Sequence, residues 1–591
     1  MADSYFLLAA TFIPLLLAPV AYAIGRKAGA KSATWFSFGA LAVSTGLLLI
    51  PAIGIYTGQQ RIYVEQYAWG QFGNFGLKLD GLSLPFALII YILCTVIALY
   101  SRPYMVHKVR EDLPGHGNGG GSGGVGGGEG VGVGHGSDDP SSHGSHALPS
   151  KNIGSSSQAT VLDTQQYIKN QVALYFALYL TFSMGMIGTV LATNLIQFYV
   201  FFELMLVPSF FLIAFYGYGA RRRIALMFFF WTHVGAVVLL LGLLAMGFFA
   251  GGFDFDTIRA NASNIPAQWL PLIVFALVIG LGVKLAAFML HIWLPYAHAE
   301  APTPVSALLS PAMIGIGAYG LLRLWIELLT NTGSYEQYSL YINMWGLATM
   351  IYGGAMALMQ DDIKKVLAYS SISQMGYILF GLGSESILGI TGGTMMYVTH
   401  GLGKAILFMM AGSIILQTGT RSMAKLGGLA GKMPYTAVIA MIGALTIIGI
   451  PPTSGFMAEW TLFSGVLQTA ATQMDPLRTT MFALGILTTV LSSAYILWMY
   501  KRIFFGKIPE QLTHVRDPNW YITATMGVLA ALTLIIGVYP DLFLNPITDY
   551  YNDVMFKGQE GVLPIPSQAT GTESGVASEN VAQNSGGEGG I

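Results

Sequence analysis

The chain is poor in cysteine and in charge. Its 591 residues include one cysteine, Cys94, and only 10% of them are charged, whereas soluble domains carry roughly a quarter. A single cysteine excludes a disulfide framework and a thiolate metal cluster. The net charge of −1 gives no sign of a nucleic-acid partner. With 54% apolar residues, the composition is typical of an all-α, multi-pass membrane protein.

The N-terminus lacks the pattern of a cleavable signal. No basic segment precedes its first apolar run and no small-residue cleavage site follows, so residues 5–25 are expected to form a retained span. A window of about 20 residues predicts about fourteen membrane-spanning helices along the chain. They are expected to begin near Tyr5, Thr34, Gly81, Val172, Asn194, Arg223, Trp269, Thr303, Tyr341, Ile363, Leu388, Tyr435, Thr479 and Trp520.

Lysines and arginines are distributed unevenly between the two sets of loops. The loops that follow odd-numbered spans hold most of them, and the opposite side shows only Arg61, Lys78, Arg259, Arg478 and Lys557. By the positive-inside rule, both termini are predicted to lie on the outer side of a cell membrane.

Two stretches have compositions that cannot bury a core. The range 114–160 is rich in Gly, Ser and His, and 558–591 is rich in Gly and Ser, so both are predicted to be disordered. The histidines of the first range either bind a metal weakly or belong to a solvated linker. The expected organisation is three helices in 1–113, the loop 114–160, helices four to eight in 161–330, helices nine to thirteen in 331–508, a fourteenth in 509–557 and the tail 558–591.

Two predicted spans carry interruptions. In the seventh, Lys284, His291 and His298 fall seven residues apart and would share one face of a continuous helix, but the prolines at 295, 302 and 304 argue against such continuity. The twelfth, from about 435 to 469, contains GIPPTSG in its middle, which indicates either a broken helix or a proline kink. The seventh and twelfth spans run in opposite directions, as in two inverted five-helix repeats with ion sites at discontinuous helices.

Four ionisable side chains fall inside predicted spans: Glu203, Lys284, Lys404 and Glu459. Each costs about 2.5 to 3.5 kcal/mol at mid-bilayer and so requires a partner, water or a function. Glu203 is either half of a static ion pair or a carboxylate that pairs with Lys284 in one state and releases it in another, which would switch the proton affinity of the lysine. His400 lies four residues before Lys404 and shares its helix face. His233 in the sixth span has no such neighbour.

Several long motifs carry a family resemblance. The runs YVFFELMLVPSFFLI, KLAAFMLHIWLPYAHAEAPTPVSALLS, DDIKKVLAYSSISQMGY, HGLGKAILF and GIPPTSGFMAEW resemble the antiporter-like membrane subunits of respiratory complex I. That family is related to multi-subunit cation/proton antiporters and to membrane-bound hydrogenases. Glu459 stands where the sibling L- and N-type subunits tend to carry lysine, which favours the M-type subunit, chain 4.

The resemblance implies a proton-translocating subunit of a complex I-type NADH (or other donor):quinone oxidoreductase. The chain itself is then expected to bind no cofactor and no metal, with quinone, FMN and iron–sulfur clusters in partner membrane-complex subunits. The transported ion would be the proton or, as an option, Na⁺. The chain would be surrounded by membrane lipid, and no nucleic-acid partner is expected. The alternative is a subunit of a Na⁺/H⁺ antiporter or of a membrane-bound hydrogenase-type complex.

The resemblance also assigns site residues. It implies roles in proton transfer for Glu203, Lys284, His291, His400, Lys404 and Glu459, whereas His298 and Glu300 are expected at or beyond the break. Two positions depart from the family pattern: the usual eighth-helix lysine falls on Gly315 and the usual tenth-span histidine on Gln374. Lys404 is the candidate replacement for the missing cation.

Overall fold

The computed structural model describes residues 4–113 and 153–555. The predicted tail 558–591 and most of the predicted loop 114–160 lie outside these residues. Helix α4 already begins at Ile153, so the end of that loop prediction is wrong. The helices are α1 (Phe6–Ala28), α2 (Ala30–Tyr56), α3 (Ser83–Glu111), α4 (Ile153–Leu191), α5 (Leu195–Leu204), α6 (Leu206–Tyr216), α7 (Arg221–Ala250), α8 (Phe255–Asn261), α9 (Leu270–Leu285), α10 (Trp293–Glu300), α11 (Thr303–Leu308), α12 (Ile316–Gly320), α13 (Ser334–Leu358), α14 (Ile363–Leu382), α15 (Ile387–Thr418), α16 (Pro434–Ile448), α17 (Ser454–Thr472), α18 (Pro476–Phe504), α19 (Trp520–Val538) and α20 (Asp541–Tyr550).

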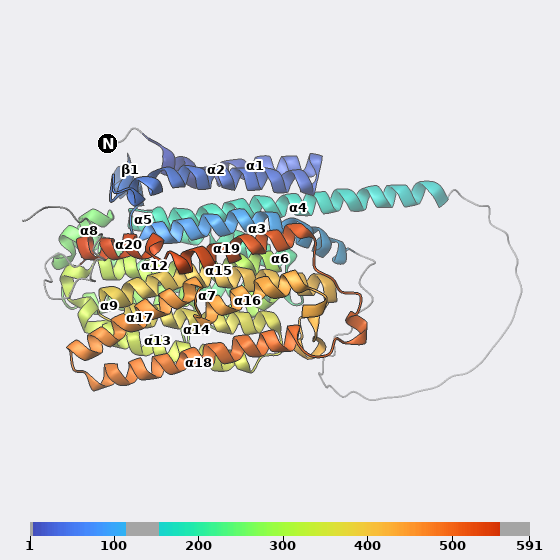
Figure 1. Ribbon diagram of the computed structural model, residues 1–591. Helices are drawn as coiled ribbons and strands as arrows, with labels where there is room; N and C mark the ends of the chain where they lie inside the picture. The colour runs from blue at the N-terminus through green and yellow to red at the C-terminus, as the bar shows by residue number, and fades with distance from the viewer. Residues whose placement is uncertain (1–3, 114–152, 556–591) are drawn as a thin grey trace, which may run out of the picture.

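Most of these helices lie side by side as a bundle (Figure 1). Within the described residues, 10 helical segments are long and apolar enough to cross a membrane, with α5–α6 and the run Thr303–Glu327 counted as one each. The other expected spans correspond to α13, α14 and the interrupted pairs α9/α10 and α16/α17. Every predicted span therefore has a helical counterpart, and the prediction of an all-α membrane bundle is confirmed.

Both interrupted spans are broken, as predicted, but the first breaks for another reason. α9 ends at Leu285, where Ala286 adopts the left-handed conformation (φ 58, ψ 43), and α10 begins at Trp293. The break precedes Pro295, which lies in the first turn of α10. N–H groups of a first turn have no partner within the helix, so a proline there breaks no hydrogen bond. In the twelfth span, α16 ends at Ile448, Gly449 is left-handed (φ 77, ψ 41), and α17 begins at Ser454.

Two elements were not expected from the sequence. An antiparallel hairpin, β1 (Tyr63–Ala68) and β2 (Asn74–Leu79), lies between α2 and α3. Glu65 of β1 accepts hydrogen bonds of 2.9 Å from the backbone N–H groups of Leu7 and Leu8, so the hairpin caps the positive end of α1. The predicted fourteenth region also holds two helices, because α20 follows α19 as a separate element.

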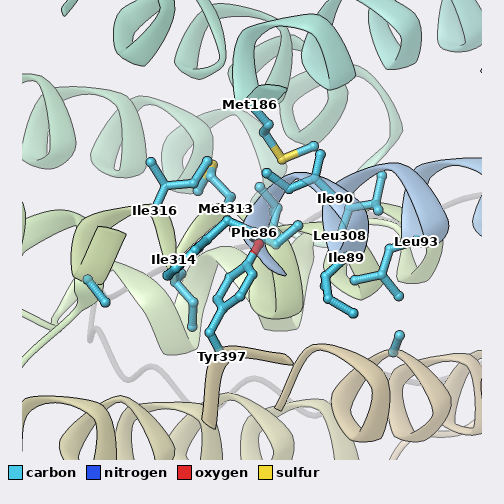
Figure 2. Close-up of a cluster of buried hydrophobic side chains, with 14 of the residues drawn as sticks. Phe86, Ile89, Ile90, Leu93, Met186, Leu308, Met313, Ile314, Ile316 and Tyr397 are labelled. Atoms are coloured by element: carbon cyan, nitrogen blue, oxygen red, sulfur yellow. Dashed lines mark hydrogen bonds between the residues drawn. The ribbon is translucent and has the colours of Figure 1, made fainter. Parts of the chain in front are cut away.

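The most buried helices form the centre of the bundle. The apolar window of Thr303–Glu327 is 100% buried and that of α15 is 94% buried, whereas the windows of α1, α7 and α18 are 33% buried and leave most of their side chains at the periphery. Figure 2 shows part of the central packing, where side chains from α3, α4, α11, α12 and α15 meet. Its labelled residues are Phe86, Ile89, Ile90, Leu93, Met186, Leu308, Met313, Ile314, Ile316 and Tyr397.

Candidate functional site

Lys284 is the penultimate residue of α9 and lies at the break of the seventh span. Its side chain is 2% exposed, and its ammonium nitrogen lies 4.8 Å from the centre of the Phe202 ring. Among the described residues, none forms a hydrogen bond or an ion pair with that nitrogen. The predicted buried cation just before a helix break is therefore present, held by an aromatic face instead of an anion.

Glu203 lies beside Phe202, near the end of α5. Asn194 caps this helix by accepting a hydrogen bond of 2.9 Å from the N–H of Ile196. Glu203 does not form the predicted pair with Lys284 in this structure: its Oε2 lies 2.9 Å from Nδ1 of His233. Its other oxygen, Oε1, is buried without a partner among the described residues. His233 has no such neighbour in its own span, because its polar partner Glu203 lies on another helix.

Two histidines follow Lys284 across the break. His291 lies in the broken segment, and its Nε2 is 3.0 Å from the hydroxyl of Tyr352 on α13. His298 lies beyond the break in α10, as predicted, and is fully buried between the rings of Trp293 and Phe408. Neither ring nitrogen of His298 has a partner among the described residues, and Nδ1 of His291 also lacks one.

His400 and Lys404 lie one turn apart on the continuous helix α15, and both are buried. The ammonium of Lys404 donates to the hydroxyl of Ser370 and to the carbonyl oxygen of Leu367, 3.2 Å away. Both ring nitrogens of His400 are buried without a partner among the described residues. Lys404 is thus anchored by α14, while the imidazole of His400 is not.

Glu459 lies on α17 against the second broken helix. It is 8% exposed, and no described residue donates a hydrogen bond to its carboxylate. A Cβ atom added to Gly449 would lie 2.5 Å from Oε2 of Glu459, so the left-handed glycine both ends α16 and makes room for the carboxylate. Glu459 and Lys284 therefore occupy comparable places, each beside the break of a discontinuous helix.

The region between Lys284 on α9 and the pair His400 and Lys404 on α15 is apolar. α12 packs against α9, since a Cβ on Gly317 would lie 3.0 Å from Cβ of Leu285, and the residue before α12, Gly315, faces α15, since its Cβ would lie 2.1 Å from the ring of Tyr397. That ring stacks on Phe86 at 4.2 Å, within the cluster of Figure 2. No lysine fits at 315 while Tyr397 occupies this position.

Further polar groups, missed by the sequence analysis, lie near the ends of the bundle. At the end where basic residues concentrate, the ammonium of Lys364 donates to the carbonyl oxygen of Ala301, just after α10. At the other end, Arg323 is fully buried and binds Asp80 (2.7 Å), Glu327 (2.6 Å) and the hydroxyl of Tyr550 on α20 (2.7 Å). Only the Arg323–Glu327 pair is local, at i,i+4 spacing; Asp80 and Tyr550 lie far away in the sequence.

Two residues of this network, Lys78 in β2 and Asp80 just after it, have displaced pKa values. Burial, reinforced by the positive charge of Arg323, lowers the pKa of Lys78 to about 8, although Asp80 opposes the shift. Burial alone would raise the pKa of Asp80, but the charges of Arg323 and Lys78 outweigh it and hold that pKa well below its usual range. Asp80 is therefore an anion that Arg323 and Lys78 compensate.

Within the described residues, no group of three or more His, Cys, Asp or Glu side chains has the arrangement of a metal site. What the bundle contains instead is two broken helices, each beside a buried ionisable side chain. Such an arrangement defines an ion-translocating membrane protein, since charges at that depth are retained for transport and discontinuous helices form the ion sites of many transporters.

Comparison with known proteins gives the family. Residues 192–492 match the family described as NADH:quinone oxidoreductase/Mrp antiporter, TM, and residues 69–112 match one described as NADH-Ubiquinone oxidoreductase (complex I), chain 5 N-terminus. The chain belongs to the NADH:quinone oxidoreductase/Mrp antiporter membrane family. The predicted family resemblance is thereby confirmed.

Similar proteins extend this result. The chain is 34% identical over 398 residues to F(420)H(2) dehydrogenase subunit M of Methanosarcina mazei, covering 66% of this chain and 77% of that protein. It is 34% identical over 379 residues to NADH-quinone oxidoreductase subunit M of Rickettsia typhi, covering 64% and 75%. Its fold is similar to a chain of respiratory complex I from Thermus thermophilus, with a TM-score of 0.72, 22% identity, and coverage of 93% and 100%.

The same fold occurs in a chain of the Mrp complex from Dietzia sp. DQ12-45-1b, with a TM-score of 0.71, 20% identity, and coverage of 93% of this chain and 98% of that one. At this level of identity, the likeness concerns the fold alone.

Proposed function

We propose that this chain is the proton-conducting M-type subunit of a redox-driven membrane complex and binds no redox cofactor itself. Relatives at 34% identity are named as M subunits of two oxidoreductases, which favours a redox complex over a free-standing antiporter. Quinone, FMN and iron–sulfur clusters would then belong to partner subunits. The chain's part in the enzyme is to move protons through the bundle when electron transfer elsewhere changes the electrostatic field.

One observation supports this function most directly: the carboxylate that should neutralise Lys284 is bound to His233 instead. The ammonium of Lys284 has no hydrogen bond or ion pair among the described residues and lies 4.8 Å from the centre of the Phe202 ring, while Glu203 Oε2 lies 2.9 Å from His233 Nδ1. A buried lysine beside a carboxylate holds its proton more tightly than one without it. Exchange of Glu203 between His233 and Lys284 would therefore bind and release a proton at Lys284.

His233 acts in this scheme as the alternative partner of Glu203. Its ring stacks on Phe229 at 5.6 Å, so α7 fixes the imidazole in reach of the carboxylate. When His233 is protonated, it attracts Glu203 away from Lys284; when it is neutral, the carboxylate returns to the ammonium. The two cations compete for one anion, and the competition couples a proton on α7 to a proton on α9.

The second half of the chain supports a separate proton path. His298 and His400 each keep both ring nitrogens buried and unpartnered in the described structure, and buried polar atoms of this kind are normally satisfied by water. Lys364 and Lys404 are close enough for their charges to act on His298. Protons would enter near Lys364, pass along His298, Lys404 and His400, and leave at Glu459.

The apolar cluster around Tyr397 separates these two paths. A proton that moved from Lys284 through water to His400 would have to cross this cluster, where Gly315 replaces the family's lysine and the Tyr397 ring fills the space beside it. We therefore propose that the halves are coupled through the electric field of their charges, which acts over distances where no proton moves. His291, bound to Tyr352, belongs to the first path.

Pumping in sealed membrane vesicles tests this function. Glu203→Gln should abolish proton uptake while Glu203→Asp retains part of it, because only the aspartate can still exchange partners. Lys284→Ala should also abolish uptake, and Lys404→Ala should abolish it if Lys404 supplies the missing cation. Full uptake in both Glu203 variants would refute the switch.

A Na⁺/H⁺ antiporter subunit is the second candidate, favoured by the fold shared with the Mrp complex chain. Purification of the chain from its own membrane, followed by peptide mass spectrometry, separates the two functions. Iron–sulfur and quinone-site subunits in the same particle are expected. Recovery of small membrane subunits alone would instead establish the antiporter.

The orientation is also a proposal, supported by the loop charges. The basic ends of α1, α3 and α18 lie on one side, so the positive-inside rule places that side in the cytoplasm and both termini outside the cell membrane. A reporter fused to the C-terminus should be reached by a membrane-impermeant label on intact cells. Protection of that reporter in intact cells would reverse the orientation.

A further inference from the structure

A cavity of about 220 Å³ opens between α2, α3 and α19, near the basic end of the bundle. Its walls have two kinds of side chain. Trp35, Leu99 and Val106 provide apolar surface, and Arg102, Asn519 and Tyr521 provide polar groups. No aspartate or glutamate lines the cavity, so its only formal charge is the positive charge of Arg102.

Among the described residues, Arg102 lacks the anionic partner that Arg221 and Arg421 have. It is half-buried, and no residue in 4–113 or 153–555 accepts a hydrogen bond from its guanidinium. By contrast, Arg221 binds Asp112 at 2.7 Å, and Arg421 binds Asp362 at 2.7 Å. A partly desolvated guanidinium requires an acceptor, and its planar donors suit carboxylate or phosphate best.

The remaining polar groups also supply donors. The side-chain oxygen of Asn519 accepts a hydrogen bond of 3.3 Å from the N–H of Tyr521, which leaves the Asn519 amide N–H groups available. The Tyr521 hydroxyl has no partner among the residues that the structure describes. Together with Arg102, these groups surround the cavity with donors and no competing anion.

The aromatic side chains place the cavity at headgroup depth. Trp35 is 44% exposed, Trp520 is 66% exposed, and Trp520 stacks on Tyr521 at 4.0 Å. Exposed tryptophan and tyrosine gather at the boundary between hydrocarbon and water. Arg102 therefore lies at the depth of the lipid phosphates. Leu99 lies about one helical turn deeper along α3, toward the hydrocarbon.

We propose that this cavity binds one anionic phospholipid, with its phosphate on Arg102, Asn519 and Tyr521 and its acyl chain along Leu99 and Trp35. Basic pockets between transmembrane helices are known to hold such headgroups. The site lies apart from the ionisable residues of the proton path, so it stands or falls separately from the proposed function.

Native mass spectrometry of the full-length chain, delipidated and titrated with phosphatidylglycerol or phosphatidylcholine, tests the site. Wild type should retain one phosphatidylglycerol in preference to phosphatidylcholine. Arg102→Gln should weaken that binding roughly tenfold, the size expected for loss of a charge-assisted contact. Arg222→Gln is the matched control, because Arg222 is an exposed arginine at the same end of the bundle but outside the cavity, and the variant should bind lipid as wild type does.

Two further variants keep the test decisive if Arg102→Gln folds poorly. Arg102→Lys keeps the charge and should retain the preference for phosphatidylglycerol. Val106→Trp keeps Arg102 but fills the cavity, so it should lose the bound lipid. Inorganic phosphate at millimolar concentration should not displace the lipid, because phosphate cannot use the apolar walls.

Several results would overturn the proposal. Equal binding by wild type, Arg102→Gln and Val106→Trp would mean that the lipid is merely annular. Displacement by inorganic phosphate would assign the cavity to a free anion. Loss of a co-purifying subunit from Arg102→Gln, with lipid binding unchanged, would assign Arg102 to a protein contact.

Discussion

Replacement of Gly315 by lysine tests whether the centre of the bundle is dry. The substitution restores the side chain that the family usually has in the eighth helix, at a position where Cβ would lie 2.1 Å from the Tyr397 ring. Tyr397 cannot move freely, because it stacks on Phe86 at 4.2 Å and is fully buried. Overpacking should cost about 1–3 kcal/mol, and an unpaired charge at this depth about 2.5–3.5 kcal/mol more.

The two costs can be separated by their variants. Gly315→Ala should show only the packing cost and Gly315→Lys both costs. Gly315→Lys with Tyr397→Ala, compared with Tyr397→Ala alone, should show mainly the cost of the charge. The thermal unfolding midpoint of the full-length chain in detergent measures all three. Gly431→Lys is the control, because that glycine is exposed and an added Cβ meets nothing within 4 Å. Equal midpoints for Gly315→Ala and Gly315→Lys would mean that water solvates the ammonium, and the dry separation of the two proton paths would be wrong.

Three other predictions concern stability. Arg323→Leu should cost about 3–5 kcal/mol, since it leaves Asp80 and Glu327 buried with too few cations, and a loss below about 1 kcal/mol in thermal unfolding would contradict this. Ala286→Gly should raise the unfolding midpoint, because it removes about 1 kcal/mol of left-handed strain at φ 58; a lower midpoint would show that the methyl group packs more favourably than it strains. Because the folded pKa of Lys78 is lowered to about 8 from 10.5, the unfolded chain binds more protons between these values. Stability should therefore rise with pH across that window by up to about 3 kcal/mol, and Lys78→Met should flatten the rise; an unchanged slope would exclude Lys78 as its source.

Much of this architecture follows from the sequence, for identifiable reasons. Hydropathy predicts spans because the bilayer leaves backbone groups no partner outside a helix, and buried charges such as Lys284 and Glu459 are visible as exceptions. The contact between Glu203 and His233 was not predictable, because it joins residues 30 positions apart on helices whose rotation the sequence does not specify. The left-handed Ala286 that makes the break was not predictable for a similar reason. Prolines mark where a helix cannot continue, whereas an alanine becomes left-handed only when tertiary packing compels it.

The cap that Glu65 places on α1 has a consequence for biogenesis. The N–H groups of Leu7 and Leu8 belong to the first turn of the first helix, yet their acceptor is made only after all of α2 has been synthesised. Until then, the amino end of α1 must remain in contact with water or translocation machinery, because no other described side chain satisfies these two donors. A nascent chain arrested before residue 65 should therefore show an α1 whose depth in the membrane is still adjustable, and emergence of the hairpin should fix it.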